Sequence, residues 1–247
     1  MDSSTGISMQ NFPLLKIIFH NNNGTNIGVY ILPLCFTVFF CERGTIMITP
    51  ILKEKTVYLL RQLKNYDKTT YDHSFRVAQN SIVVTERYPE LISINGNVFY
   101  TGCLLHDIGK IGISEKILTK PSQYTPEEKE DMEQHPLMGA HMLRDYPKEV
   151  VVCALFHHEK IDGSGYPAHF EDGEIPAYCE FLSVLDILDA LTSTRPYKNA
   201  VTDIAIIEEI LSNGSLRKKY VDIVVDLLKQ RKLLTEKEIQ ICQEKIS

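Results

Sequence analysis

The 247-residue sequence contains no tryptophan, no Cys-x-x-Cys pair and no excess of positive charge. Its formal net charge of −6 argues against a nucleic-acid polymer as the main partner, because such partners are bound through basic surfaces. The cysteine spacing is not that of a zinc finger. We expect reduced core cysteines in a cytosolic protein. They are Cys35, Cys41, Cys103, Cys153, Cys179 and Cys242.

The composition is that of an ordinary globular protein, with 44% hydrophobic and 23% charged residues. The length suffices for one large or two small domains. A small anionic ligand remains compatible with the negative net charge, because a bound metal supplies local positive charge.

Residues 1–46 differ in pattern from the rest of the chain. A turn signal at Asn21–Gly24 lies between short apolar runs and favours a β-hairpin or small strand unit. A loose arm is a close alternative, and the uncharged stretch 24–41, which contains Pro33, has the minimum length for a membrane segment. A cleaved signal is less favoured. A further alternative is that this stretch does not belong to the natural protein, because the region with a regular apolar pattern begins at Met47. We treat 1–46 as an extension and 47–247 as the main domain.

From residue 51 the apolar spacing predicts helices almost to the end of the chain. A Thr125–Glu128 capping signal marks one start, Pro136 interrupts the helix that follows, and Pro147 begins another. The predicted helices cover about 51–63, 70–88, 97–107, 125–134, 147–158, 176–194, 202–212, 219–232 and 235–246.

Seven of the eight histidines lie between His73 and His169, which is more clustered than core histidines would be. The central motif is His106-Asp107-Ile108-Gly109-Lys110, directly after an apolar run. A carboxylate has two oxygens, so Asp107 can bridge two cations while His106 binds one. We expect Gly109 to allow a tight turn that brings Lys110 back to the same point.

The other candidate ligands lie at helix ends or on an apolar helix. Asp186 and Asp189 are three residues apart and share a helix face, where buried acids need partners. Imidazoles mixed with carboxylates favour Fe, Mn, Ni or Zn over Mg or Ca. Seven ligands are too many for one tetrahedral zinc and suit two ions bridged by Asp107. The set is His73, His106, Asp107, His135, His157, His158 and Asp186.

Several motifs in the same order resemble the HD-GYP phosphodiesterases, over about residues 50–230. They are His106-Asp107-Ile108-Gly109-Lys110, His135-Pro136 with Gly139, His157-His158-Glu159, Asp162-Gly163-Ser164-Gly165-Tyr166-Pro167, Asp186 to Ser193 and Arg195-Pro196-Tyr197-Lys198.

The resemblance implies an all-α HD-superfamily helical bundle with a metal centre between helices. It implies hydrolysis of cyclic di-GMP to linear pGpG, and in some members on to GMP. The seven candidates correspond to metal ligands for two divalent transition metal ions, with Fe or Mn favoured and Ni or Zn as alternatives. Lys110 corresponds to a phosphate-contacting catalytic lysine beside Asp107, and Arg195 to a second substrate contact. Gly165, Tyr166 and Pro167 correspond to the signature loop at the substrate pocket.

The sequence departs from the family pattern at several positions. Thr69 stands where some members have a glutamate that helps to hold a third metal, so we favour two ions, and coordination by both His157 and His158 stays open. Lys160 stands where the family usually has arginine. Only about 50 residues precede the catalytic part, too few for the sensory or receiver domain that many members carry.

Two other classes of function stay open. One is a catalytically silent protein that senses cyclic di-GMP or docks a diguanylate cyclase. The other is an HD hydrolase of another nucleotide, such as cyclic GMP-AMP; the Gly165-Tyr166-Pro167 loop argues against nucleoside triphosphates. Asp189 either orients Lys110 or a metal ligand, or forms a salt bridge on its own helix face. His20, His141 and His169 match no motif, and we expect surface or structural roles for them. The sequence does not define the oligomeric state.

Overall fold

The computed structural model describes residues 54–193, 201 and 204–229, together with the backbone of four strands between residues 15 and 46. The chain divides into two compact units. One unit contains the strands, and the other begins at Tyr58, within the first helix.

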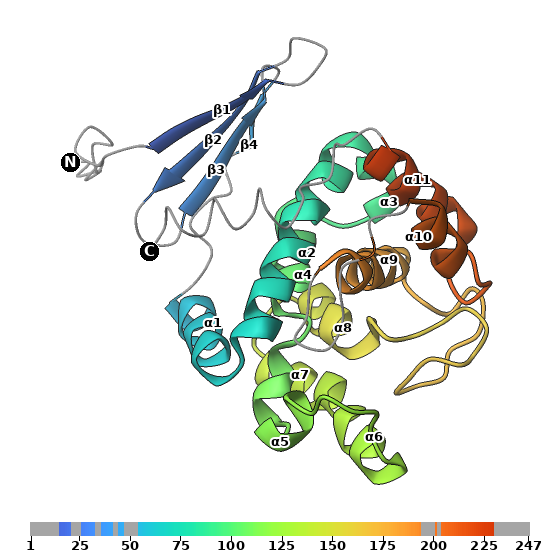
Figure 1. Ribbon diagram of the computed structural model, residues 1–247. Helices are drawn as coiled ribbons and strands as arrows, with labels where there is room; N and C mark the ends of the chain where they lie inside the picture. The colour runs from blue at the N-terminus through green and yellow to red at the C-terminus, as the bar shows by residue number, and fades with distance from the viewer. Residues whose placement is uncertain are drawn as a thin grey trace. The chain divides into compact units, whose positions relative to one another are not determined.

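The four strands form one antiparallel sheet in the order β1-β2-β3-β4 (Figure 1). Their bounds are β1 (Leu15–His20), β2 (Asn26–Leu32), β3 (Phe36–Cys41) and β4 (Gly44–Ile46). His20 pairs with Asn26, so the first hairpin spans the predicted turn. The backbone described there is that of a small strand unit. Within the described residues, no helix has the length and apolar character needed to cross a membrane.

The rest of the described chain is mostly helical, which confirms the predicted all-α bundle. The helices are α1 (Glu54–Tyr66), α2 (Lys68–Arg87), α3 (Pro89–Ile92), α4 (Gly96–Leu105), the 3₁₀ helix η2 (Ile108–Gly112), α5 (Glu115–Leu118), α6 (Pro126–Met132), α7 (His135–Met142), α8 (Lys148–Phe156), α9 (Ala177–Thr192), α10 (Ile204–Leu211) and α11 (Lys218–Lys229). The helix predicted at 235–246 lies outside the described residues.

Short polar side chains fix the starts of the helices that carry the site. The Asp67 carboxylate accepts two backbone N–H groups at the start of α2, and Asn95 accepts one at the start of α4. The predicted Thr125–Glu128 capping box is present in α6. Pro136 occupies the first turn of α7, where its missing N–H costs nothing, so it begins a helix as well as interrupting one.

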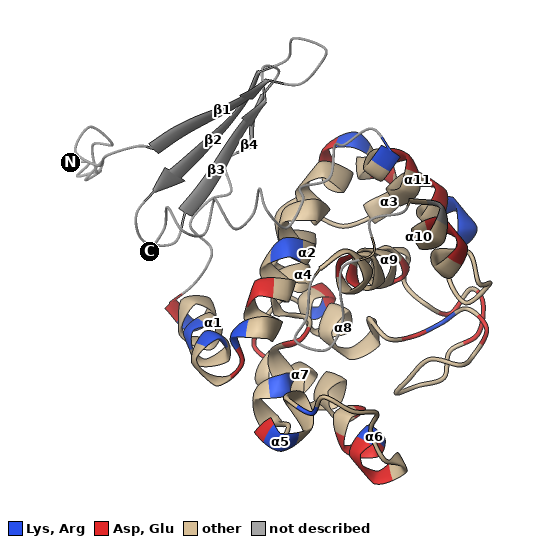
Figure 2. Ribbon diagram, viewed as in Figure 1, with Lys and Arg blue, Asp and Glu red and all other residues tan. Residues whose placement is uncertain are grey.

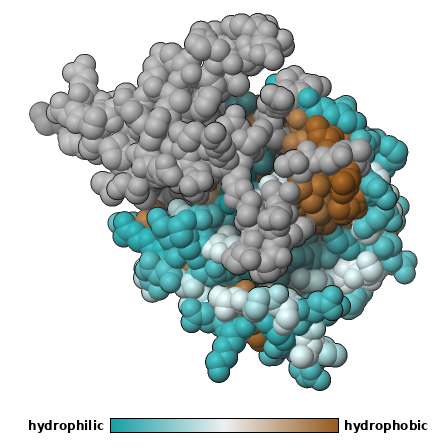
Figure 3. All heavy atoms as spheres, viewed as in Figure 1, coloured by the Kyte–Doolittle hydropathy of each residue, from teal (hydrophilic) through white to brown (hydrophobic). Residues whose placement is uncertain are grey.

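Helix α9 lies at the centre of the bundle, in contact with α2, α3, α8, α10 and α11 (Figure 1). Its Phe181, Leu182 and Leu185 are almost completely buried. Each such apolar side chain stabilises the fold by roughly 1.5–3 kcal/mol. Among the described helices, charged residues are frequent on α1, α5, α6 and α11, whereas most of the visible part of α9 is uncharged (Figure 2). Where the described surface is visible, it is mainly hydrophilic outside one hydrophobic area (Figure 3).

Three cysteines at the contacts between α4, α8 and α9 are buried and unpaired. They are Cys103, Cys153 and Cys179. For the described part of the chain, this confirms the prediction of reduced core cysteines.

Candidate metal centre

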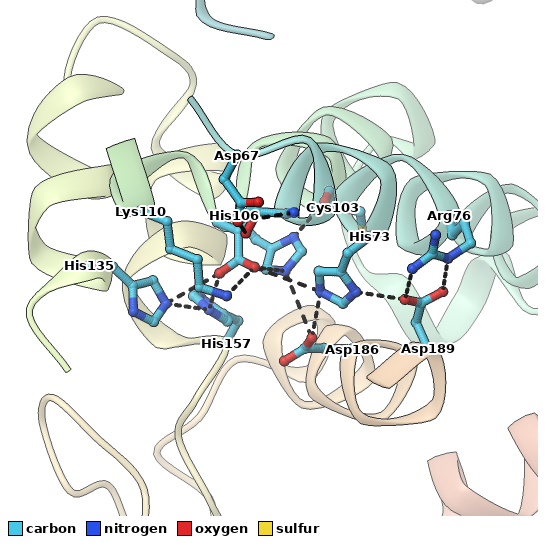
Figure 4. A network of polar contacts seen from close by, with 12 residues as sticks. Asp67, His73, Arg76, Cys103, His106, Lys110, His135, His157, Asp186 and Asp189 are labelled. Atoms are coloured by element: carbon cyan, nitrogen blue, oxygen red, sulfur yellow. Dashed lines mark hydrogen bonds and ion pairs between the residues drawn. The ribbon is translucent and has the colours of Figure 1, made fainter. Parts of the chain in front are cut away.

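Five parts of the chain bring the seven predicted ligands together: α2, the turn between α4 and η2, the start of α7, the end of α8, and α9. Figure 4 shows how His73, His106, His135, His157 and Asp186 point toward one another. The ligand atoms of His73, His106 and Asp107 all lie within 4.8 Å of one another. Those of Asp107, His135, His157 and His158 form a second such group. Asp186 joins the first group, because its Oδ1 lies 2.9 Å from His73 Nε2.

The position of His106 and Asp107 differs slightly from the prediction. Helix α4 ends at Leu105 rather than including the pair, so both residues lie in the turn before η2. The turn directs both side chains towards the same centre, and both are buried.

Asp107 belongs to both ligand groups through different oxygens. Its Oδ2 lies 3.7 Å from His73 Nε2 and 3.5 Å from His106 Nε2. Its Oδ1 lies 3.3 Å from His135 Nε2 and 3.6 Å from His157 Nε2. This is the arrangement expected of a carboxylate that bridges two cations.

Backbone carbonyls define the tautomers of three of these histidines. A carbonyl oxygen only accepts, so the ring nitrogen facing it carries the hydrogen and the other nitrogen carries a lone pair. In each ring the facing nitrogen is Nδ1, which leaves Nε2 free for a metal. The contacts are His106 to Cys103 O at 2.7 Å, His135 to Met132 O at 2.7 Å and His157 to Ala154 O at 3.0 Å.

These free acceptors converge in a buried space. His135 Nε2 and His157 Nε2 lie 3.2 Å apart, although both are acceptors in the neutral rings. His106 Nε2 and Asp107 Oδ1 are buried and have no hydrogen-bond partner among the described residues. Such acceptors cost about 1–3 kcal/mol each when left unpaired. Two nitrogens at about 2.1 Å from one ion lie about 3 Å apart, so the donor set fits a cation.

His73 lies between two carboxylates. Its Nδ1 is 2.7 Å from Asp189 Oδ2, and its Nε2 faces Asp186. Burial by itself lowers the pKa of His73, but hydrogen bonds to Asp186 and Asp189 raise it to about 9. Arg76 Nε and Nη2 bind the two Asp189 oxygens at 2.7 and 2.9 Å. Asp189 therefore orients His73, a candidate ligand, rather than Lys110. Its salt bridge joins α9 to α2 and does not lie along the face of α9.

Burial keeps three other histidines of the centre neutral. Burial lowers the pKa of His106 to about 4 and also lowers the pKa values of His135 and His158. Burial opposes ionisation of Asp107, but the Lys110 ammonium and the neighbouring histidines hold the pKa of its carboxyl well below the usual range. Neutral imidazoles around an ionised carboxylate are the protonation states that metal binding requires.

Lys110 returns to the centre as predicted, and its Nζ donates to Asp107 Oδ2 at 2.6 Å. The expected role of Gly109 in allowing a tight turn is wrong, because this glycine is not among those with positive φ. A Cβ at position 109 would lie 1.9 Å from His135 O and 2.5 Å from Gly139 N. Gly109 therefore permits close packing of η2 on α7, rather than an unusual turn.

The signature loop lies against the histidines. The Tyr166 ring stacks on His158 with centroids 4.7 Å apart and meets His135 edge-on at 6.4 Å. A Cβ on Gly165 would lie 2.4 Å from Lys160 N, so the glycine lets the loop pack on the backbone after His158. Pro167 follows Tyr166 through a cis peptide bond. Arg195 lies outside the described residues.

Two residues with direct roles in the site geometry were not singled out from the sequence. Arg76 follows His73 by three residues on the same helix face, a spacing that could have indicated it. Glu159 directly follows the histidine pair, and its buried carboxylate accepts the N–H groups of Ala168 at 2.6 Å and Phe170 at 3.0 Å. The Glu159 carboxylate thereby holds the part of the loop that follows Pro167.

Thr69 and the described histidines outside the ligand set are exposed. His141 and His169 are exposed, as expected. Thr69 is exposed in the first turn of α2, where its N–H binds the Asp67 carboxylate. The side chain of His20 is outside the described part of the structure.

Comparisons with known proteins identify the family of this chain. An HD domain family model matches residues 90–220. A cyclic di-GMP phosphodiesterase of Thermotoga maritima is 40% identical over 150 residues, which cover 57% of this chain and 39% of the relative. The 3'3'-cGAMP-specific phosphodiesterase 1 of Vibrio cholerae is 30% identical over 161 residues, covering 63% of this chain and 37% of the relative.

A solved structure shares the fold. It is an HDG"Y"P protein from Bdellovibrio bacteriovorus, with a TM-score of 0.55, 21% identity and coverage of 66% of this chain and 53% of that one. The matched region thus spans less than half the length of the two curated relatives. The family model covers more than half of this chain and includes all the candidate ligands except His73. Together with the helical bundle and its buried His/Asp cluster, this match shows that the chain belongs to the HD domain family.

Proposed function

We propose that this chain is a metal-dependent phosphodiesterase that hydrolyses cyclic di-GMP to linear pGpG. The observation that carries the proposal is Asp107, which presents one oxygen to each of two histidine groups. The name of the Thermotoga maritima relative supports the substrate.

The donor set divides between two divalent transition metal ions, for which we favour Fe or Mn and keep Ni or Zn as alternatives. The His73 group consists of His73, His106, Asp107 and Asp186. The His135 group consists of Asp107, His135, His157 and His158. When bound, such ions lower the pKa of a coordinated water and polarise the phosphoryl group.

The protein's own residues position and stabilise the reacting phosphodiester. The Lys110 side chain is 20% exposed beside Asp107, so its ammonium can also reach a substrate oxygen. There it stabilises the charge that grows on the phosphoryl oxygens in the transition state. Tyr166 lies over His158, where its ring limits access to the His135 group. From the family resemblance, we assign Arg195 a second contact to substrate.

Product analysis tests this proposal. Metal-loaded protein is incubated separately with cyclic di-GMP, cyclic GMP-AMP and a nucleoside triphosphate, and the products are separated by chromatography. We expect pGpG from cyclic di-GMP, with GMP as a later product. Binding of cyclic di-GMP without any product would support the alternative of a silent sensor or of a protein that docks a diguanylate cyclase.

A second candidate substrate is cyclic GMP-AMP, since a relative named for that activity is 30% identical to this chain. Faster hydrolysis of cyclic GMP-AMP than of cyclic di-GMP would reassign the substrate and keep the proposed metal centre.

A further inference from the structure

One histidine of the His73 group is held differently from the other histidines of the centre. His106, His135 and His157 each donate Nδ1–H to a backbone carbonyl. His73 instead donates to the Asp189 carboxylate at 2.7 Å. Among the four histidines with a described Nδ1 contact, only His73 has a charged partner at Nδ1.

Asp189, which contacts His73, is itself held by Arg76, a residue on the same helix as His73. The Arg76 guanidinium binds Asp189 through two parallel contacts of 2.7 and 2.9 Å. The side chains of Arg76 and Asp189 are 11% and 4% exposed. A bidentate pair of this kind restricts both side chains, and so it holds the His73 ring in one orientation (Figure 4).

The two groups also differ in negative charge. The His73 group contains the carboxylates of Asp107 and Asp186, with Asp189 behind the ring of His73. The His135 group has only the shared Asp107 among its members, and its other donors are imidazoles. A carboxylate bonded to the distal nitrogen of an imidazole increases its basicity as a metal ligand, and each further carboxylate attracts a cation.

We infer that the two metal positions are unequal, and that the Arg76–Asp189 pair makes the His73 group the tighter position, which fills first. The His135 group is then the weaker position, from which metal exchanges more readily. This inference rests on the metal centre of the proposed function, and not on the identity of the substrate.

The competing explanation is that Arg76 and Asp189 only fasten α2 to α9. The chain offers a matched control for this role at the other end of α9. There Arg217 binds both carboxylate oxygens of the buried Glu180, with its Nη2 2.8 Å from Oε1, and also contacts Asp172. That pair fastens α9 to the segment before α11, and none of its partners is a candidate ligand.

The experiment is a titration of the metal-free full chain with Mn²⁺, in which isothermal titration calorimetry measures the affinity of each binding step. For the unchanged protein we expect two steps whose affinities differ at least tenfold. Arg76→Ala and Asp189→Asn should weaken the tighter step by roughly 10–100-fold and leave the weaker step within twofold. Arg76→Lys, which keeps the charge but loses the paired contact, should recover part of the affinity. Arg217→Ala should change neither step.

Two ligand variants assign the steps to the two groups. His73→Ala should remove the tighter step, and His135→Ala the weaker one. Two equal steps, one single step, an equal effect of Asp189→Asn on both steps, or loss of the tighter step in His135→Ala would each overturn the inference. Circular dichroism confirms that each variant is folded, and Asp189→Asn keeps the size of the side chain. Because the readout is metal binding, a missing phosphodiesterase activity leaves this test intact.

Discussion

At the scale of single residues, the centre depends on which nitrogen of each ring carries the hydrogen. Sequence patterns place histidines near a metal but do not choose between Nδ1 and Nε2. Here backbone carbonyls bind the Nδ1 atoms of His106, His135 and His157, which leaves their Nε2 atoms as acceptors, whereas both ring nitrogens of His73 face carboxylates. The shared Asp107 then lies within 3.3 to 3.7 Å of all four Nε2 atoms.

The first prediction concerns the shared carboxylate. Asp107→Ala should lose both metal ions and activity, because one side chain serves both groups. Elemental analysis after reconstitution, with close to two equivalents expected for the unchanged protein, measures the loss. The exposed His141 provides the control, and His141→Ala should retain both metals and activity. Full metal content in Asp107→Ala would refute the bridging role.

The second prediction separates metal binding from stabilisation of the transition state. Lys110→Ala should keep the metals and lower turnover by roughly two to three orders of magnitude, because it removes one charge that faces the reacting phosphoryl group. Substrate binding should weaken less than turnover. Steady-state kinetics on metal-matched proteins measures both effects. If Lys110 only caps a helix end, turnover per folded molecule will be unchanged.

At the scale of elements, two close backbone contacts hold together segments that carry candidate ligands. The 3₁₀ helix η2 lies against the start of α7 at Gly109, and the signature loop lies against the segment after α8 at Gly165. In both places the neighbouring atoms belong to the backbone, which moves less easily than a side chain.

The third prediction uses two glycines of η2 as a matched pair. Gly109→Ala should destabilise the protein by about 1–3 kcal/mol or more, because its Cβ would meet the His135 carbonyl at 1.9 Å. Gly112→Ala would meet only the flexible end of Met138 and should cost less. Urea denaturation followed by circular dichroism compares the two. Equal destabilisation would show that backbone packing is not the cause.

The fourth prediction concerns the fastening of the signature loop. Glu159→Gln should place an NH₂ donor against one of two backbone N–H groups, of Ala168 or Phe170. The expected cost is about 1–3 kcal/mol, with faster hydrogen exchange at these two amides. Hydrogen exchange followed by mass spectrometry measures it. The exposed Glu130 serves as the control, and exchange in the loop that rises equally in Glu130→Gln would contradict the assignment.

At the scale of the whole molecule, the core and the centre are parts of one helical arrangement. Leu105 and Ile108 belong to a buried cluster with Leu63, Leu143, Val150 and Ala154. They flank His106 and Asp107 in the sequence, so the burial of these apolar neighbours fixes the motif in place.

The fifth prediction follows from this coupling. A chelator should lower the melting temperature, because an ion that binds only the folded state stabilises it by about 2.7 kcal/mol at a hundredfold excess over Kd. For a domain of this size, the shift should be roughly 5–10 °C. Differential scanning calorimetry with and without Mn²⁺ measures it. The Asp107→Ala variant should show no shift, and an equal shift there would mean that the chelator acts elsewhere.

The sequence by itself determined the helical class, most helix positions and the identity of the candidate ligands. Apolar periodicity, capping residues and prolines act locally, so they are visible in the order of residues, as at Thr125 and Pro147. The seven candidate ligands were recognisable because His and Asp are rare on apolar helix faces and because their motifs match a known family.

Only the tertiary structure decided which partners those residues have. Asp189 and His73 are 116 residues apart in sequence, and Arg76 reaches the same carboxylate across 113 residues. No local pattern encodes such a contact, because it depends on how α2 packs on α9. The same holds for Gly109, whose requirement comes from the backbone of α7 rather than from its own φ. The division of the ligands into two unequal groups is therefore a property of helix packing, since packing alone fixes which oxygen of Asp107 faces which histidines.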